Sequence, residues 1–403
     1  MDARDERGHD AEGLGLGKIQ SIANKTKKRK RMATTKTRVG VPWDGRTAYE
    51  RWVEDDLRLD LHRGYSASSL RTASLKPWSE RGIAAAFYDI TGAESLAGLY
   101  VGEIAPGQSS KPARQLCDDV VFIMSGRGST TVETAKGPIS FEWGPRSLFA
   151  IPLNHHFVMH NNSGREPARF VSVNTIPIVY NLFRDPRFVF GCDWQFDRIN
   201  PDVNLADSVL YQPDANHERT AVNLHDTCFV PDIFMVQRTS FKERGSGNKT
   251  VYFELANSVI SVHVAEHPGL RFYNPHRHGP SAFVFTLGEA SGYTLMWQDS
   301  GKEVRFDWPE NDIGVVVPPN MWWHGHFGTS PSAMQLAIKL RSRKFPLNHL
   351  FDKTHKHVSE GGTVLRYTDL EQGLRERVWR TYVEECRRRG YEVKDPTKGE
   401  VEA

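Results

Sequence analysis

The sequence has few cysteines and no long apolar run, and each absence excludes a class of protein. Its four cysteines, Cys117, Cys192, Cys228 and Cys386, stand far apart and form no CxxC pair. This argues against a disulfide framework and against a zinc knuckle, and favours reduced thiols in a cytoplasmic protein. No apolar stretch is long enough to cross a bilayer, and the N-terminus lacks a charged-then-apolar signal, so we expect no membrane partner.

The net charge is also low, at +3 over 403 residues, but it is unevenly placed. Residues 1–40 hold eleven Lys/Arg and five Asp/Glu, so the other 41 basic and 44 acidic residues leave the rest of the chain at −3. The basic run 25–31 could be a nuclear address or a nucleic-acid contact, although no aromatic residue interleaves it. We expect residues 1–45 to be a disordered leader. Alternatively, the start codon is placed too early, since Met32 directly follows the basic run. We expect no nucleic-acid partner.

Three histidines are the most informative residues present. His276 and His278 belong to an Asn-Pro-His-Arg-His stretch, and His324 follows two tryptophans. Side chains alternate along a strand, so His276 and His278 point the same way while Arg277 points away. His324 comes after Val-Val-Val-Pro-Pro-Asn, a strand entering a turn, and a closed barrel would bring it beside the pair. The spacing therefore predicts a mononuclear metal site with three neutral nitrogen donors.

The run 279–285, just after this pair, contains no carboxylate and no imidazole. Three histidines on one side of an octahedral ion leave three adjacent positions, enough for a bidentate substrate and dioxygen. That arrangement favours iron(II) oxygen chemistry over a structural zinc, which four ligands would close. Imidazole suits zinc, iron, copper and nickel, so the ligand type alone does not choose the metal.

These motifs resemble those of the cupins, whose two-part signature is Gly-x5-His-x-His and, later, a Pro-x-Gly-like turn followed by His. Gly269 stands in the place of the first glycine, with six residues before His276 instead of five, and Asn320 replaces the second glycine. Many cupins supply a glutamate five residues after the second histidine, where this chain has Phe283. Within the cupins, residues 259–340 look most like the gentisate 1,2-dioxygenase type, which reads His-Arg-His, an apolar strand and Trp-His-x-His. The matching residues are His276, Arg277, His278, Trp323, His324 and His326.

The resemblance implies an iron(II)-dependent dioxygenase that cleaves a carbon–carbon bond of a small oxygenated substrate, an aromatic hydroxy acid, with dioxygen as co-substrate. Two alternatives stay open. One is a redox-neutral decarboxylase, isomerase or lyase that uses manganese, nickel or zinc as a Lewis acid, although such cupins often retain the glutamate. The other is a non-enzymatic binding or storage protein, since bicupins include seed-storage relatives.

His326 would face the same side as His324 if the strand continues. It could act as a catalytic acid or base near the metal, hydrogen-bond a metal ligand, or serve only a structural role. Four large side chains could line the substrate pocket and exclude water around an aromatic or apolar substrate, or could instead belong to the core. They are Phe283, Phe285, Trp297 and Trp322.

From about residue 84 to residue 340 the chain consists of short apolar runs separated by Gly, Pro, Asn and Asp, which is typical of an all-β barrel or sandwich. This pattern occurs twice, because residues 101–107 match residues 265–269 and residues 148–154 match residues 314–320. The chain therefore resembles a bicupin. We predict an all-β fold of two cupin (double-stranded β-helix, jelly-roll) barrels with flanking helices. The predicted limits are 46–200 for the first barrel, 201–355 for the second, and 356–403 for a C-terminal helical segment.

The repeat places Lys111 and Ala113 opposite His276 and His278, and Phe157 opposite His324. It also places Asp118 where the family glutamate belongs. We therefore predict a first barrel without metal, although three nearby histidines keep the alternative open: His155, His156 and His160.

Two capping boxes predict helices outside the barrels, one at residues 47–50 and one at residues 368–371. The second helix would carry one apolar face that packs on a barrel or on a neighbouring subunit, and a homo-oligomer is the expected assembly. That face comprises Leu370, Leu374, Val378 and Tyr382.

Overall fold

A computed structural model describes residues 43–196, 198, 207–213, 222–241, 247–271, 273–340 and 356–393. Residues 1–42 of the predicted leader, and the boundaries predicted near residues 200 and 355, lie outside the described residues, so those domain limits stay predictions. Strands account for most of the regular structure in the described residues, and the helices there are short apart from one of 17 residues near the C-terminal end. In the part of the chain that is described, no helix combines the length and the apolar character needed to cross a membrane.

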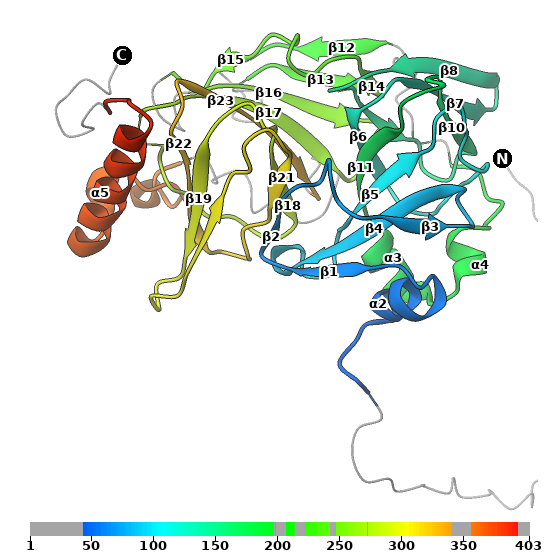
Figure 1. Ribbon diagram of the computed structural model, residues 1–403, viewed down its shortest axis with the longest axis horizontal. Helices are drawn as coiled ribbons and strands as arrows, with labels where there is room; N and C mark the ends of the chain where they lie inside the picture. The colour runs from blue at the N-terminus through cyan, green and yellow to red at the C-terminus, as the bar shows by residue number, and fades with distance from the viewer. Residues whose placement is uncertain are drawn as a thin grey trace, which may run out of the picture. The chain divides into compact units, whose positions relative to one another are not determined.

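The first barrel is built from two sheets whose strands are mostly antiparallel (Figure 1). Its larger sheet has the strand order β1-β4-β5-β11-β6-β9-β14, with β3 paired to β4, and its smaller sheet has the order β10-β7-β8. The strands are β1 (Leu61–Gly64), β3 (Lys76–Trp78), β4 (Ile83–Ile90), β5 (Gly98–Ile104), β6 (Asp119–Ser125), β7 (Gly128–Thr134), β8 (Gly137–Trp143), β9 (Leu148–Ile151), β10 (Phe157–Asn161), β11 (Ala168–Asn174) and β14 (Phe229–Val230).

The second barrel repeats this plan. Its larger sheet has the order β12-β13-β16-β17-β23-β18-β21-β2, with β15 paired to β16, and its smaller sheet has the order β20-β19-β22. The strands are β2 (Ser66–Ala67), β12 (Ser208–Tyr211), β13 (Leu224–Thr227), β15 (Thr239–Ser240), β16 (Lys249–Leu255), β17 (Ser261–Pro268), β18 (Ala282–Thr286), β19 (Gly292–Trp297), β20 (Glu303–Asp307), β21 (Gly314–Val316), β22 (Trp323–Gly328) and β23 (Ser332–Lys339). The predicted fold class, all-β with two jelly-roll barrels and flanking helices, is confirmed.

Each half contributes a short strand to the larger sheet of the other half. β2 lies in sequence between β1 and β3 of the first barrel but pairs with β21 of the second, with Ser66 opposite Val316. β14 lies in sequence between β13 and β15 of the second barrel but pairs with β9 of the first, with Phe229 opposite Phe149. The two barrels are therefore joined by backbone hydrogen bonds as well as by side-chain packing.

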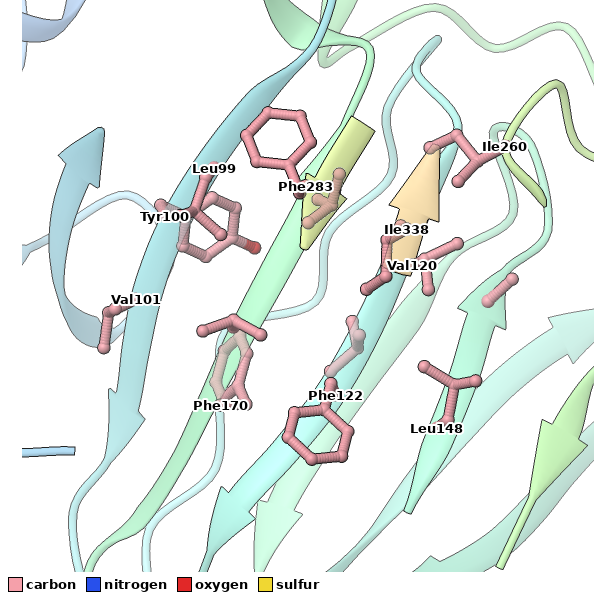
Figure 2. Close-up of a cluster of buried hydrophobic side chains, with 14 of the residues drawn as sticks. Leu99, Tyr100, Val101, Val120, Phe122, Leu148, Phe170, Ile260, Phe283 and Ile338 are labelled. Atoms are coloured by element: carbon pink, nitrogen blue, oxygen red, sulfur yellow. The ribbon is translucent and has the colours of Figure 1, made fainter. Parts of the chain in front are cut away.

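The larger sheet of the second barrel is covered on both faces, because a partly polar face lines the barrel and an apolar face packs on the first barrel. On β17, Val262 and Val264 belong to the shared core, whereas His263, Ala265 and His267 face the barrel interior. Close-packed apolar side chains from both halves thus form a single core. Figure 2 shows part of it, with Leu99, Tyr100, Val101, Val120, Phe122, Leu148 and Phe170 of the first half beside Ile260, Phe283 and Ile338 of the second.

Several short helices lie in the first half of the chain. They are α2 (Ala48–Arg51), η1 (Trp52–Asp56), η2 (Thr91–Ala93), α3 (Ile176–Phe183) and α4 (Pro186–Val189). The capping box predicted for α2 is present, since Thr47 and Glu50 each accept a hydrogen bond from the other residue's backbone N–H. Trp52 of η1 stacks on Tyr180 of α3 with ring centroids 4.9 Å apart, which joins the two helices. Its edge-on contacts with Trp78 of β3 and Phe87 of β4, each at 6.1 Å, pack these helices on the barrel.

The second barrel is covered by η6 (Val358–Glu360), η7 (Tyr367–Asp369) and α5 (Gln372–Arg388), and α5 lies against β19 and β22 (Figure 1). The predicted apolar face of this helix is confirmed, with Val378 and Tyr382 buried against the barrel. The capping box predicted at residues 368–371 is wrong. Glu371 is the N-cap instead, because its carboxylate accepts hydrogen bonds from the backbone N–H groups of Gly373 and Leu374.

Candidate metal centre

The His276–His278 segment is held between two other stretches of backbone. On one side, His276 and His324 exchange backbone hydrogen bonds of 2.9 Å in both directions. On the other side, the Arg277 N–H donates to the Thr363 carbonyl at 3.1 Å. A stretch far away in the sequence therefore fixes the segment that carries the first two histidines.

The structure brings the three predicted metal ligands together. The ring centroids of His276 and His324 lie 4.2 Å apart, those of His278 and His324 lie 4.6 Å apart, and those of His276 and His278 lie 5.6 Å apart. All three side chains are buried. Among the described residues, this is the one group of three or more His, Cys, Asp or Glu side chains close enough to hold an ion.

Backbone carbonyls orient two of the three imidazoles. Nδ1 of His278 lies 2.9 Å from the Gly279 carbonyl oxygen, and Nδ1 of His324 lies 3.1 Å from the Trp322 carbonyl oxygen. A carbonyl oxygen only accepts hydrogen bonds, so both Nδ1 atoms carry the proton. The Nε2 atoms of these neutral rings then present their lone pairs, which is how a protein prepares histidine for a metal.

The donor set fits one transition-metal ion. Neutral imidazole is a ligand for iron, zinc, copper and nickel. Metal–nitrogen bonds of about 2.1 Å hold adjacent ligand nitrogens about 3 Å apart. The candidate ligand atoms lie within 4.8 Å of one another, so small side-chain rotations would bring them to one ion.

A pocket with an empty volume of about 490 Å³, part of it open to solvent, adjoins the histidines. Inward-facing side chains of β16, β17 and β23 form one wall, and the histidine-bearing segments form another. The lining residues are Phe241, Thr250, Tyr252, His263, Ala265, His267, Tyr273, His276, His278, Val284, His326, Gln335, Ala337 and Lys339.

His326 lines this pocket, as predicted for a residue on the same side as His324. Its ring centroid lies 6.1 Å from that of His276. Its Nδ1 lies 3.0 Å from the hydroxyl of Thr294, and this hydroxyl accepts a hydrogen bond from Trp308 Nε1. The Thr294 proton can then go to Nδ1 of His326, which leaves the imidazole proton of His326 on Nε2.

The four large side chains predicted as pocket wall do not line this pocket. Phe283 and Phe285 are fully buried in the core shared with the first barrel, because alternation on β18 turns Val284 inward instead. Trp297 packs among the side chains that α5 covers. Trp322 lies beside Tyr65, with ring centroids 5.7 Å apart. These four residues belong to the core, as the alternative prediction stated.

Several pocket residues were missed from the sequence, chiefly His263 and His267 on β17 and Gln335 and Lys339 on β23. The signal that could have found them is the His-x-Ala-x-His alternation of β17. His267 is itself held in place, since its two ring nitrogens lie 2.7 Å from Asn248 Oδ1 and 2.9 Å from Gln335 Oε1.

The first barrel shows what stands at the equivalent positions. Ala113 and Phe157 exchange backbone hydrogen bonds of 3.0 and 2.8 Å, in the way that His276 and His324 do. Ala113 is therefore the counterpart of His276, so the predicted equivalence of Lys111 with His276 is wrong by two residues. The same shift makes Gln115 the counterpart of His278. Neither Ala113 nor Phe157 carries an atom that can ligate a metal.

The prediction that Asp118 stands at the place of the family glutamate is also wrong, because the strand registers make Val120 the counterpart of Phe283. Asp118 accepts hydrogen bonds from Arg198 and from the Val259 N–H. Asp119 accepts hydrogen bonds from Gln115 Nε2 at 3.0 Å and from Ser172 Oγ at 2.5 Å. Burial raises the pKa of Asp119 to about 6, and the two hydrogen bonds oppose that rise.

No protein-family model and no curated protein sequence matches this chain. Solved structures with a similar fold include an oxalate decarboxylase of Lactobacillus farciminis in complex with formate, at 11% identity and a TM-score of 0.45, covering 69% of this chain and 86% of that one. They also include vicilin of Corylus avellana, at 11% identity and a TM-score of 0.43, covering 70% of this chain and 86% of that one. A third is a 7S globulin of Momordica charantia, at 11% identity and a TM-score of 0.43, covering 69% of this chain and 84% of that one. At this identity the likeness concerns the fold and transfers no activity. The resemblance to gentisate dioxygenases stays a prediction.

Proposed function

We propose that the second barrel holds one divalent metal ion through His276, His278 and His324, and that the protein is an iron(II)-dependent dioxygenase acting on a small oxygenated acid. The observation that supports this most is the convergence of three buried imidazoles, two of them with Nδ1 hydrogen-bonded to backbone carbonyls. Bound iron(II) would supply the electron transfer and the open coordination positions that oxygen activation requires.

The side chains around the triad would bind the substrate and exclude water. β18 contains Phe283 at the place of the missing glutamate and has the sequence Ala-Phe-Val-Phe-Thr. It therefore offers no carboxylate that could occupy a further coordination position of the metal. Tyr252 and Tyr273 contribute aromatic surface to the pocket wall. His326 would exchange a proton with the substrate through Nε2, because Nδ1 is engaged by Thr294.

The test is metal analysis of protein purified without air, followed by oxygen uptake with gentisate, salicylate and catechol. We expect about one iron per chain and uptake of oxygen in proportion to substrate. His278→Ala and His324→Ala should lose nearly all of the metal. His160→Ala should keep it, since His160 lies in the first barrel with Nδ1 against the Ser109 hydroxyl. Turnover without oxygen would point to a redox-neutral lyase or isomerase, and wild-type protein that takes up no metal would contradict the proposal.

A further inference from the structure

The first barrel has a pocket of its own, in the place that the metal pocket occupies in the second barrel. Its lining includes Ala113 and Phe157, which are the counterparts of His276 and His324. The pocket has an empty volume of about 290 Å³, part of it open to solvent, and none of its described lining residues is an aspartate or a glutamate. The free space inside is limited, which favours a ligand of only a few non-hydrogen atoms.

Arg81 places a guanidinium group where the second barrel would hold its metal ion. Nη2 of Arg81 donates a hydrogen bond of 2.7 Å to Oε1 of Gln115, the counterpart of His278. The central carbon of the guanidinium lies 5.9 Å from the centroid of the Phe157 ring, which stands in the place of His324. A fixed positive charge therefore adjoins two of the three positions that are equivalent to the candidate ligands.

Aromatic rings hold this guanidinium in the barrel. The central carbon of Arg81 lies 5.4 Å from the centroid of the Trp78 ring and 5.4 Å from that of the Phe190 ring. Burial lowers the pKa of Arg81, because little water remains around its charge. Arginine nevertheless stays protonated in proteins. The site thus contains a permanent cation that is poorly solvated, and such a charge favours a partner of opposite sign.

The pocket offers hydrogen-bond donors that have no acceptor among the described residues. The hydrogen bond to Gln115 is the one that the Arg81 guanidinium donates within that part of the chain. Oγ of Ser110 accepts from the Met159 N–H at 3.0 Å, which leaves the hydroxyl proton of Ser110 available. Lys111 is exposed, and its backbone N–H donates to the Arg81 carbonyl at 2.8 Å, so a second cation belongs to the same lining.

Asp119 is the acidic residue whose charge acts on Arg81, and it does so through an intervening amide. Nε2 of Gln115 donates to Oδ2 of Asp119 at 3.0 Å, while Oε1 of Gln115 accepts from Arg81. No direct ion pair joins Arg81 to a carboxylate in the described residues. Even when Asp119 is fully ionised, it offsets one of the two positive charges of Arg81 and Lys111. The pocket keeps a net positive charge.

We infer that the first barrel is a binding site for a small monocarboxylate, with Arg81 as the cation that anchors it. The planar guanidinium can donate two parallel hydrogen bonds to the two oxygens of a carboxylate. Ser110 and Lys111 add further donors, and Ile83 and Met159 provide apolar surface for a short hydrocarbon group. This site goes beyond the proposed function and does not depend on the metal centre, which lies in the other barrel.

The experiment is titration calorimetry of the full chain with sodium acetate and with acetamide, a neutral ligand of nearly the same shape. Treatment with a chelator beforehand ensures that the second barrel offers no metal ion to acetate. A constant, high concentration of sodium chloride fills any site that binds anions without selection. We expect saturable binding of acetate and no measurable binding of acetamide.

Arg81→Met should weaken acetate binding roughly 10- to 100-fold, as expected for loss of hydrogen bonds to a charged group. Lys111→Met should weaken it by a smaller factor, about 2- to 5-fold, because Lys111 is exposed. Arg127→Met is the matched control and should leave the affinity unchanged, since Arg127 is exposed in the same barrel and lies outside the pocket lining.

Wild-type protein that binds acetate no better than acetamide would overturn the inference, and this measurement does not depend on the folding of any variant. Acetate binding that survives Arg81→Met at full strength would also overturn it, because the ligand would then bind elsewhere. If Arg81→Met fails to fold, Lys111→Met decides: a loss of affinity relative to Arg127→Met supports the site, and equal affinity of these two variants refutes it.

Discussion

At the scale of single residues, Asp119 of the first barrel links buried charge to stability. Its side chain is almost fully buried, and its hydrogen bonds to Gln115 and Ser172 do not fully offset the cost of burying a carboxylate. Burial raises its pKa from 3.8 to about 6. At pH values between 3.8 and about 6, Asp119 keeps its proton in the folded chain but has already released it in the unfolded chain. The free energy of unfolding therefore falls as pH rises through this window, and the loss levels off above pH 6.

Asp119→Asn should remove this part of the pH dependence. The wild-type contribution amounts to at most about 3 kcal/mol between pH 4 and pH 7, since each pKa unit is worth about 1.4 kcal/mol. Urea unfolding of both proteins across this range measures the difference in slope. Asp193→Asn is the control, because Asp193 is exposed. An unchanged slope in Asp119→Asn would mean that other groups account for the pH dependence.

The sequence predicted the three candidate ligands because their spacing carries the information. Two histidines separated by one residue share a side of any extended segment, whatever surrounds them. The pocket wall was harder to predict, because β18 is apolar on both faces and its pattern does not distinguish Phe283 from Val284. The two-residue error at Ala113 has a similar cause. The segment before it is irregular, and only the backbone hydrogen bonds to Phe157 define the equivalence with His276.

At the scale of whole elements, α5 is tied to the strands that carry the candidate site. Tyr382 is fully buried, and its hydroxyl lies 2.8 Å from the Gly328 carbonyl oxygen at the end of β22 and 3.2 Å from that of Arg271. Burial raises the pKa of this hydroxyl well above its usual range, so it stays protonated and donates. The helix was predicted from its apolar face, but its docking partner could not be, because periodicity identifies a face and not what covers it.

Tyr382→Ala should lower the free energy of unfolding by about 3–5 kcal/mol, and Tyr382→Phe by about 1 kcal/mol, because the first removes a large buried ring and the second only a hydrogen bond. Thermal and urea unfolding measure both changes. Arg380→Ala, on the exposed side of α5, should have little effect. If Tyr382→Ala costs no more than Tyr382→Phe, the helix does not depend on this packing.

At the scale of the whole molecule, the two barrels share one core and exchange strands. The duplication was visible in the sequence as repeated segments, but the exchange was not, since β2 and β14 are only two residues long and pair with strands distant in the chain. Separation of the halves would expose Phe283 and Ile338 together with their partners in the first barrel. Neither half can then keep its own outer sheet face out of water, so the stability of each depends on the other.

We therefore expect a single cooperative unfolding transition, with equal calorimetric and van't Hoff enthalpies. Phe283→Ala should destabilise the protein by about 3–5 kcal/mol. Although this residue belongs to the second barrel, the variant should also speed hydrogen exchange in β5 of the first barrel, because Leu99 and Val101 of β5 pack in the same core. Phe188→Ala serves as the control, since Phe188 is 44% exposed on α4. Two resolved transitions, or faster exchange confined to the second barrel, would show that the halves are energetically independent and that the exchanged strands contribute little to holding them together.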